Sequence, residues 1–182
     1  MRSLSLAIVF GLLVGTSACK KVDAIVDSFT QFNFEGDYLV NVPATPIASI
    51  PLEVITPDIA THSDVLYSEN KTRADLVDQV KLTALTLSVK NPVGGDLKFL
   101  KSVDIYVRAE GLPEARIAYK DNVPGDVGAT LDLDVTGVDL KEYFKKDKYQ
   151  LRIDAVSDQA VTENYGVNAH STFAVHAKVL GQ

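Results

Sequence analysis

Residues 81–90, with the sequence KLTALTLSVK, decide the fold class of this chain. From residue 85 onward apolar and polar side chains alternate strictly, which is the period of two expected of a strand that buries one face. The apolar positions of this alternation are Leu85, Leu87 and Val89. Leu82 is out of phase with that set, so the step at Thr83 and Ala84 predicts a β-bulge.

The same alternation recurs on both sides of this segment. It predicts one bent strand or two short ones over 32–42, and further strands at 50–55, 102–107, 117–119, 131–135, 149–155 and 167–179. Turn residues separate them, as in residues 91–95 (NPVGG). The sequence does not alternate strands with the long amphipathic helices that a parallel sheet needs. We therefore expect an all-β fold, a single antiparallel β-sandwich of immunoglobulin-like or jelly-roll-like type.

Two short helical turns are predicted from capping patterns. Thr72 is followed three residues later by Asp75, and Asp139 by Glu142, as at helix N-termini. The second pattern places Leu140, Tyr143 and Phe144 on one apolar side. The polar stretch 61–71 carries no predicted element.

Composition limits the class of protein. A chain of 182 residues with 46% hydrophobic and 23% charged residues fits one packed domain and excludes disorder or a polytopic membrane protein. The single Cys excludes a disulfide framework. With a formal net charge of −6 and no basic run longer than Lys145 and Lys146 in the body of the chain, we expect no nucleic-acid partner and little attraction to anionic lipid.

The N-terminus carries a predicted sorting signal over residues 1–18. Arg2 precedes the apolar stretch 4–15 (LSLAIVFGLLVG), which is too short to span a bilayer as a helix, and small residues follow up to Cys19. Cleavage after Ala18 would leave Cys19 either as a free thiol or as a lipid-bearing residue. We expect lipidation, because a chain without other cysteines would otherwise keep one exposed thiol at its new N-terminus.

The run Gly15-Thr16-Ser17-Ala18-Cys19 resembles the bacterial lipoprotein lipobox, with Thr16 where that pattern usually has Leu. The resemblance implies diacylglycerol transfer to Cys19, cleavage before it, and a tether over 19–28. Lys20, in place of Asp, implies outer-membrane sorting in the Gram-negative pattern. The whole chain resembles the small β-sandwich lipoproteins of Bacteroidetes envelopes, with residues 29–182 as the folded domain. We expect an outer-membrane lipoprotein that faces the periplasm or the cell surface.

Residues 81–135 carry a weaker, partial resemblance. A strand ends in Val89-Lys90-Asn91-Pro92, and a second strand, a glycine-containing turn, Ile117-Ala118 and Val123-Pro124 follow. In that order they resemble the late-embryogenesis-abundant type 2 (water-stress and hypersensitive response) β-sandwich, although Val93 stands where that family has Asn. The resemblance implies a sandwich that could carry an apolar ligand between its sheets.

Histidines and acids are the candidates for chemistry. His62 lies near Asp58 and Asp64 in sequence, a set that could serve hydrolysis or bind zinc. His170 and His176 fall on one face of the last predicted strand, about 20 Å apart, too far to share a metal ion. A further acidic set is expected to face water rather than bind calcium; it comprises Asp126, Asp132, Asp134 and Asp139. Because no nucleophile motif or phosphate loop is present, we expect no enzyme, no catalytic residue, no metal and no cofactor.

Function is therefore expected to lie in binding. We predict a lipid-anchored, non-catalytic binding or accessory module, attached to the membrane through Cys19, with an envelope protein or a glycan as partner. Two alternatives stay open: a carrier of an apolar ligand between the two sheets, and a carbohydrate-binding lipoprotein. The tyrosines that could offer a sugar platform are Tyr67, Tyr106, Tyr119 and Tyr165.

Overall fold

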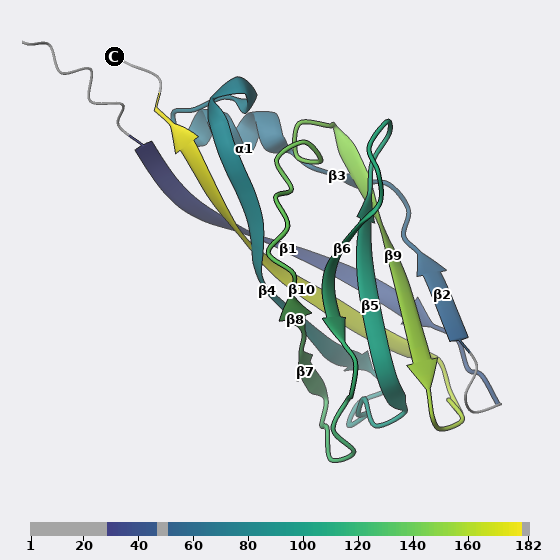
Figure 1. Ribbon diagram of the computed structural model, residues 1–182. Coiled ribbons are helices and arrows are strands. Elements are labelled where there is room, and N and C mark those ends of the chain that lie inside the picture. Colours follow the sequence, from purple (N-terminus) through teal and green to yellow (C-terminus); the bar gives the residue numbers. More distant parts are fainter. Residues whose placement is uncertain (1–28, 47–50, 180–182) are drawn as a thin grey trace, which may run out of the picture.

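Two antiparallel sheets face each other in the computed structural model, which describes residues 29–46 and 51–179 (Figure 1). The first sheet has the order β1 (Phe29–Val42), β10 (Tyr165–Lys178), β4 (Val77–Asn91) and β7 (Thr130–Asp132). The second has the order β2 (Pro51–Ile55), β9 (Lys148–Ser157), β5 (Leu100–Arg108), β6 (Ala115–Lys120) and β8 (Asp134–Val135), and β3 (Ile59–Ala60) also pairs with β9. The predicted all-β antiparallel sandwich is confirmed.

The bulge predicted in the deciding segment is present in β4. Phe173 of β10 pairs with Leu82 and Thr172 pairs with Ala84, so Thr83 is the extra residue. Its hydroxyl donates to the Thr172 carbonyl at 3.0 Å. The inserted residue restores the phase, which lets the apolar residues on both sides of it reach the same core.

The single strand predicted over 131–135 is wrong. β7 pairs with β4 in the first sheet, whereas β8 pairs with β6 in the second. Between them Leu133 is buried, and its N–H donates to the Leu85 carbonyl at 2.9 Å. The chain therefore crosses from one sheet to the other at Leu133 and closes this side of the sandwich, while the alternation of side chains continues through the crossing.

The helical predictions are only partly right. The stretch 61–71, which carried no prediction, contains α1 (Ser63–Glu69), and its Tyr67 is 2% exposed. The turn predicted after Thr72 is a single 3-10 turn, η1 (Ala74–Leu76). Thr72 does not cap it, because its hydroxyl donates to the Lys178 carbonyl at 2.7 Å.

The helical turn predicted after Asp139 is present over residues 141–145, but it does not continue into a regular helix. The N–H groups of Phe144 and Lys145 donate to the carbonyls four residues earlier, both at 3.1 Å. Asp139 Oδ1 accepts hydrogen bonds from the N–H groups of Val80 and Lys141, both at 3.1 Å. The turn buries Tyr143 and Phe144 at 6% and 3% exposure, as the apolar pattern predicted.

The strands of the two sheets run at an angle to each other, and the sheets spread apart toward the end where α1 and β3 lie (Figure 1). Buried residues of both sheets form one continuous core. One side of the sandwich is closed by the crossing at Leu133, and the other lies between β1 and the β2 and β3 strands.

Among the residues described, no helix is long and apolar enough to cross a membrane. The predicted signal peptide, Cys19 and the tether over 19–28 lie outside the described residues.

Candidate ligand-binding cleft

A hollow on the inner face of the first sheet follows from its strand register. Three successive inward-facing pairs join β1 to β10: Phe34 with Phe173, Gly36 with Ser171, and Tyr38 with Ala169. The middle pair has almost no side-chain volume, and rings stand on both sides of it. A small pair between large ones leaves space where a packed sandwich would have side chains.

Residues from the opposite side of the sandwich complete this space as a cleft. They come from residues 59–62 around β3, Leu66 of α1, Phe144, and Tyr149 and Leu151 of β9. The cleft has a volume of about 410 Å³ and is open to solvent. Farther from α1 the same inter-sheet space narrows to about 40 Å³, with an apolar lining. The core is therefore packed at one end and hollow at the other.

The apolar wall of the cleft is a cluster of aromatic rings. The Phe34 and Phe173 rings are stacked at 4.8 Å between centroids, and Phe144 meets them edge-on at 5.2 and 5.0 Å. Tyr149 lies 5.7 Å from Phe144. Such pairs stabilise one another beyond the area they bury. The wall is therefore rigid. Burial in this cluster also raises the pKa of the Tyr149 hydroxyl.

Gly36 is the residue that leaves the cleft open. A Cβ placed on it would meet no atom within 4 Å, and its backbone lies in an ordinary strand. The φ angle of Gly36 is not positive, so its backbone conformation does not require glycine, unlike that of the glycines in some turns. The glycine is therefore explained by the space in front of it rather than by its backbone.

Ser171 places one hydroxyl at the floor of the cleft. Ser171 is 9% exposed, and no described residue forms a hydrogen bond with its Oγ. Its Oγ is nevertheless reached by solvent through the open cleft. The cleft thus combines an aromatic wall with several polar side chains, among them the Ser171 hydroxyl, which can donate or accept a hydrogen bond. The others are Tyr38, Thr61, His62 and Tyr149.

The rim of the cleft carries the predicted candidate His62. Its backbone is left-handed, with φ 48° and ψ 27°, and its carbonyl accepts the Leu66 N–H at 3.0 Å at the start of α1. Beside it the Thr61 hydroxyl donates to the Lys146 carbonyl at 2.7 Å, which fixes this lip to the turn that carries Phe144. His62 lines the cleft and is exposed at its mouth.

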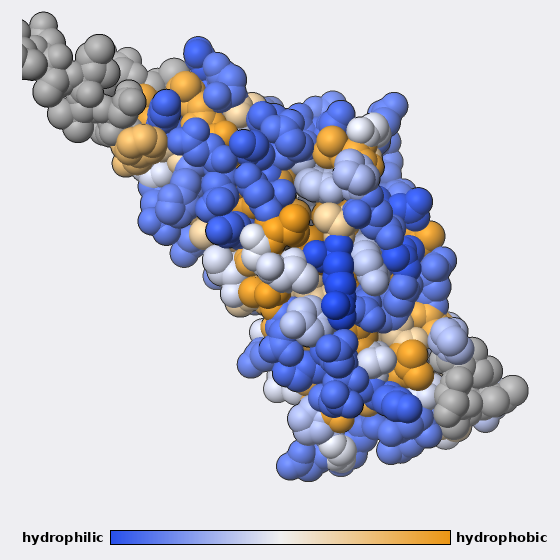
Figure 2. Space-filling view, viewed as in Figure 1, coloured by the Kyte–Doolittle hydropathy of each residue, from blue (hydrophilic) through white to orange (hydrophobic). Residues whose placement is uncertain are grey.

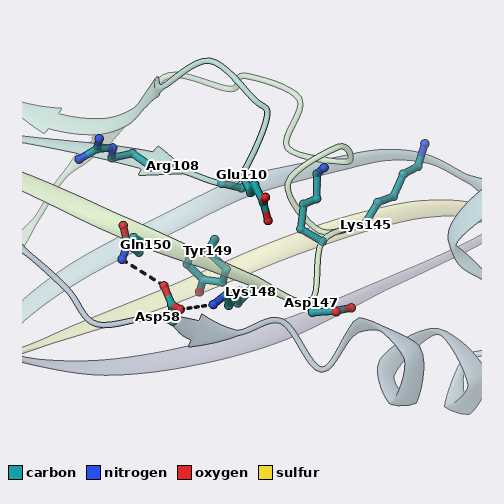
Figure 3. Close-up of a pocket in the computed structure, with 10 residues that line it drawn as sticks. Asp58, Arg108, Glu110, Lys145, Asp147, Lys148, Tyr149 and Gln150 are labelled. Carbon is teal, nitrogen blue, oxygen red and sulfur yellow. Dashed lines mark hydrogen bonds and ion pairs between the residues drawn. The ribbon is translucent and has the colours of Figure 1, made fainter.

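The predicted partners of His62 lie elsewhere. Asp58 lines a second pocket of about 560 Å³, where it pairs with Lys148 and accepts a hydrogen bond from Gln150 at 3.0 Å (Figure 3). The hydrogen bond from Lys148 lowers the pKa of Asp58. Asp64 sits in the first turn of α1. The structure therefore does not bring the three residues into one pocket.

This second pocket is lined by charges of both signs. Figure 3 shows Arg108 and Glu110 across from Asp58, with Lys145 directed away from it. The pocket shares Tyr149 with the aromatic cleft. Because its acids and bases are mixed, it offers no field of one sign to a charged ligand.

The remaining candidates for metal binding are dispersed. Asp132 accepts a hydrogen bond from Thr86 at 2.6 Å, whereas Asp134 pairs with Lys120 at 3.3 Å in the other sheet. His170 binds Asp37 on the outer face of the first sheet at 3.0 Å. In residues 29–46 and 51–179 no three His, Cys, Asp or Glu side chains are grouped closely enough to hold a metal ion.

Asp37 illustrates how β1 separates the two faces of its sheet. Its carboxylate accepts a hydrogen bond from the Asn168 amide at 2.7 Å and contacts His170 on the outer face. These hydrogen bonds, that of Asn168 first, lower the pKa of Asp37. Its backbone borders the cleft, but its charge is directed away from the aromatic wall.

None of the four tyrosines proposed as a sugar platform presents an open ring. Tyr67 is buried, and burial raises its pKa to about 12. Tyr165 packs edge-on against Phe99 at 4.8 Å. Arginines cover the other two: Arg152 lies 4.1 Å from the Tyr106 ring centroid and Arg116 lies 4.0 Å from that of Tyr119.

Arg152 is the centre of an ion-pair network on the outer face of the second sheet. Its Nε and Nη2 donate to the two Glu114 oxygens at 3.0 and 2.6 Å, and it also pairs with Asp154. The hydrogen bonds to Glu114 and then to Asp154 hold the pKa of Arg152 above its usual range. The face shown in Figure 2 is mostly hydrophilic, with hydrophobic residues in small scattered groups.

Sequence reasoning missed Gly36, Ser171 and the cleft that they form. Both residues occupy inward positions of strongly apolar strands, and this break in the pattern was the available signal. This break in the apolar pattern indicates a hollow only when the strand register is known, because the register places Gly36 opposite Ser171.

No family model matches this chain, and no curated protein matches it. Among solved structures, the chain is similar to one from turnip yellow mosaic virus, with a TM-score of 0.28, 10% identity, and coverage of 100% of this chain and 93% of that one. A chain from desmodium yellow mottle tymovirus has a TM-score of 0.25 and 9% identity, with 100% and 95% covered. Scores this low carry no argument about function.

Proposed function

We propose that this protein is a lipid-anchored envelope module that holds a small apolar or amphipathic ligand, without catalysis, in the aromatic cleft between its two sheets. The observation that carries the proposal is the cleft itself, about 410 Å³ in volume and walled by Phe34, Phe144, Phe173 and Tyr149. Its volume falls within the range of small-molecule sites, which are mostly apolar and carry a few polar groups.

The lining favours an apolar body over a charged one. The described residues that border the cleft include no Lys or Arg, and the two bordering acids, Glu35 and Asp37, belong to the edge strand β1. A ligand carboxylate or phosphate would find no Lys or Arg side chain there with which to form an ion pair.

The proposed anchor and the cleft lie near each other along the chain. β1 begins at Phe29 on the end of the sandwich where α1 lies, and Phe34 follows five residues later (Figure 1). Phe29 lies ten positions after Cys19, a length of chain that can span at most about 35 Å. A lipid on Cys19 would hold the cleft near a membrane surface, where apolar ligands collect.

The other hypotheses have less support. The carbohydrate alternative lacks an exposed ring among its four tyrosines. The hydrolytic set is dispersed, because Asp58 and His62 line different pockets and Asp64 lies in the first turn of α1. If the cleft binds no ligand, the hypothesis that remains is binding to an envelope protein.

Anchoring is tested by labelling cells with an alkyne fatty acid and detecting label on the full chain. We expect label on the wild-type chain and none on Cys19→Ser. Lys20→Asp should keep the label but move the protein from the outer to the inner membrane fraction. Label that persists on Cys19→Ser would refute attachment at this residue.

Ligand binding is tested by native mass spectrometry of the full Cys19→Ser chain, purified from its own envelope without detergent. We expect a reproducible adduct that is lost or strongly reduced in Gly36→Leu, whose side chain would occupy the space opposite Ser171. Gly125→Leu is the matched control, because a Cβ there also meets nothing within 4 Å but the residue lies in a distant turn. An adduct that survives Gly36→Leu would place the ligand elsewhere, and a bare mass throughout would favour a protein partner.

A further inference from the structure

Ser171 is an exception on the inner face of β10. The other inward residues from 167 to 177 are apolar, namely Val167, Ala169, Phe173, Val175 and Ala177. An alanine at position 171 would preserve the fold and avoid burying a polar atom. Because the Ser171 hydroxyl forms no hydrogen bond with a described residue and is open to the cleft, it is left to solvent or to a ligand there.

The other buried polar residues differ in whether their hydroxyl groups form hydrogen bonds. Thr56, Thr61 and Thr72 each use the side-chain hydroxyl in a hydrogen bond that ties two segments together. Ser157 and Ser171 have no such bond among the described residues. Ser157 borders a space of about 30 Å³, whereas Ser171 borders the cleft of about 410 Å³. Of these two serines, only Ser171 has room for a ligand in front of its hydroxyl.

The shape of the hollow limits the ligand. It extends from the pair of Phe34 and Phe173 to the pair of Tyr38 and Ala169, four residues along the strand, or about 13 Å. The rings present both faces and edges, which suits a flat ring system. The described residues that line the cleft include no Lys or Arg for an anionic group.

From this geometry we infer that the cleft selects a compact, uncharged ring compound that carries one hydrogen-bonding group, and that Ser171 Oγ binds that group while Phe34, Phe144 and Phe173 contact the rings. This inference rests on the proposed function, because it names the ligand class of the same cleft. Gly36 contributes by leaving the space directly opposite Ser171 open.

The test uses two probes that differ by one hydroxyl, naphthalene and 2-naphthol, with equilibrium dialysis against the full Cys19→Ser chain. We expect 2-naphthol to bind about tenfold more tightly, the effect of one buried hydrogen bond. Ser171→Ala should abolish this difference between the two probes. Ser157→Ala, the matched control, should preserve it.

The outcomes separate this inference from the proposed function. Equal affinities for both probes that Ser171→Ala does not alter would overturn the role of Ser171 while leaving an apolar cleft. If neither naphthalene nor 2-naphthol bound at concentrations up to its solubility limit, both proposals would be overturned. Tighter binding of 2-naphthoate than of 2-naphthol would refute selection for an uncharged ligand.

Discussion

Replacement of Gly36 by leucine should stabilise the unliganded protein while it blocks the cleft. Removing glycine from a strand interior contributes about 0.5–1 kcal/mol. A leucine side chain contributes about 1.5–3 kcal/mol when fully buried, and about half of that in a cleft open on one side. Fixing its rotamer costs about 0.5–1 kcal/mol. The sum is a gain of about 1 kcal/mol, because a Cβ at this position meets nothing within 4 Å.

Urea unfolding of the Cys19→Ser chain, followed by circular dichroism at 25 °C, measures this gain. The melting temperature should rise by about 2–4 °C. Gly95→Ala is the control of opposite sign, since its Cβ would lie 3.1 Å from Pro92 Cγ, Pro92 O and Val89 Cγ1. If Gly36→Leu lowered the free energy of unfolding by more than about 1 kcal/mol, the space opposite Ser171 would not be open and the reasoning would be refuted.

Three further predictions concern the packing and charges of the sandwich. Phe173→Ala removes a ring that is 4% exposed and stacked on Phe34, so the free energy of unfolding in urea should fall by about 3 kcal/mol, and a loss below about 1 kcal/mol would contradict this packing. Arg152→Met removes both hydrogen bonds to Glu114 and should cost about 2 kcal/mol at pH 7. The Arg152 hydrogen bonds lower the pKa of Glu114 in the folded state. Their contribution to the free energy of unfolding is therefore present above the ordinary pKa of 4.5 and is lost as pH falls through the pKa of the folded state. In acid titrations of both proteins, the difference in free energy of unfolding between wild type and Arg152→Met should shrink, and a constant difference would refute the pairing. Burial raises the pKa of Tyr67 from 10.0 to about 12, so the folded state gives up about 2–3 kcal/mol as pH rises from 10 to 12. Because burial also raises the pKa of other tyrosines such as Tyr149, Tyr67→Phe should keep an alkaline loss, but one smaller by about 2 kcal/mol between pH 8 and pH 11.5, and equal losses in both proteins would contradict this reasoning.

Much of the fold could be read from local patterns. The alternation around Leu85 gave the strand, and the phase break at Thr83 gave its bulge, because both depend on neighbours in sequence. The helix α1 escaped prediction because Tyr67 is its only buried residue, which leaves almost no periodic signal. Leu133 escaped as a crossing point because the alternation is the same on both sides of it.

The candidate site was much less accessible to sequence reasoning. His62 was singled out and does line the cleft, but its expected partner Asp58 lies in the neighbouring pocket. Gly36 and Ser171 are ordinary residues in sequence and become a site only as a cross-strand pair.

The sequence by itself determined that this protein is an antiparallel β-sandwich and which face of most strands is buried. Those properties follow from the period of two, which every strand imposes on its own side chains. Tertiary structure alone decided where the core is hollow. Gly36 meets Ser171 through the register of β1 with β10, and residues 59–62 and Phe144 cover them from other parts of the chain. Such a register depends on contacts between residues far apart in sequence, and a local pattern does not specify which strands will meet.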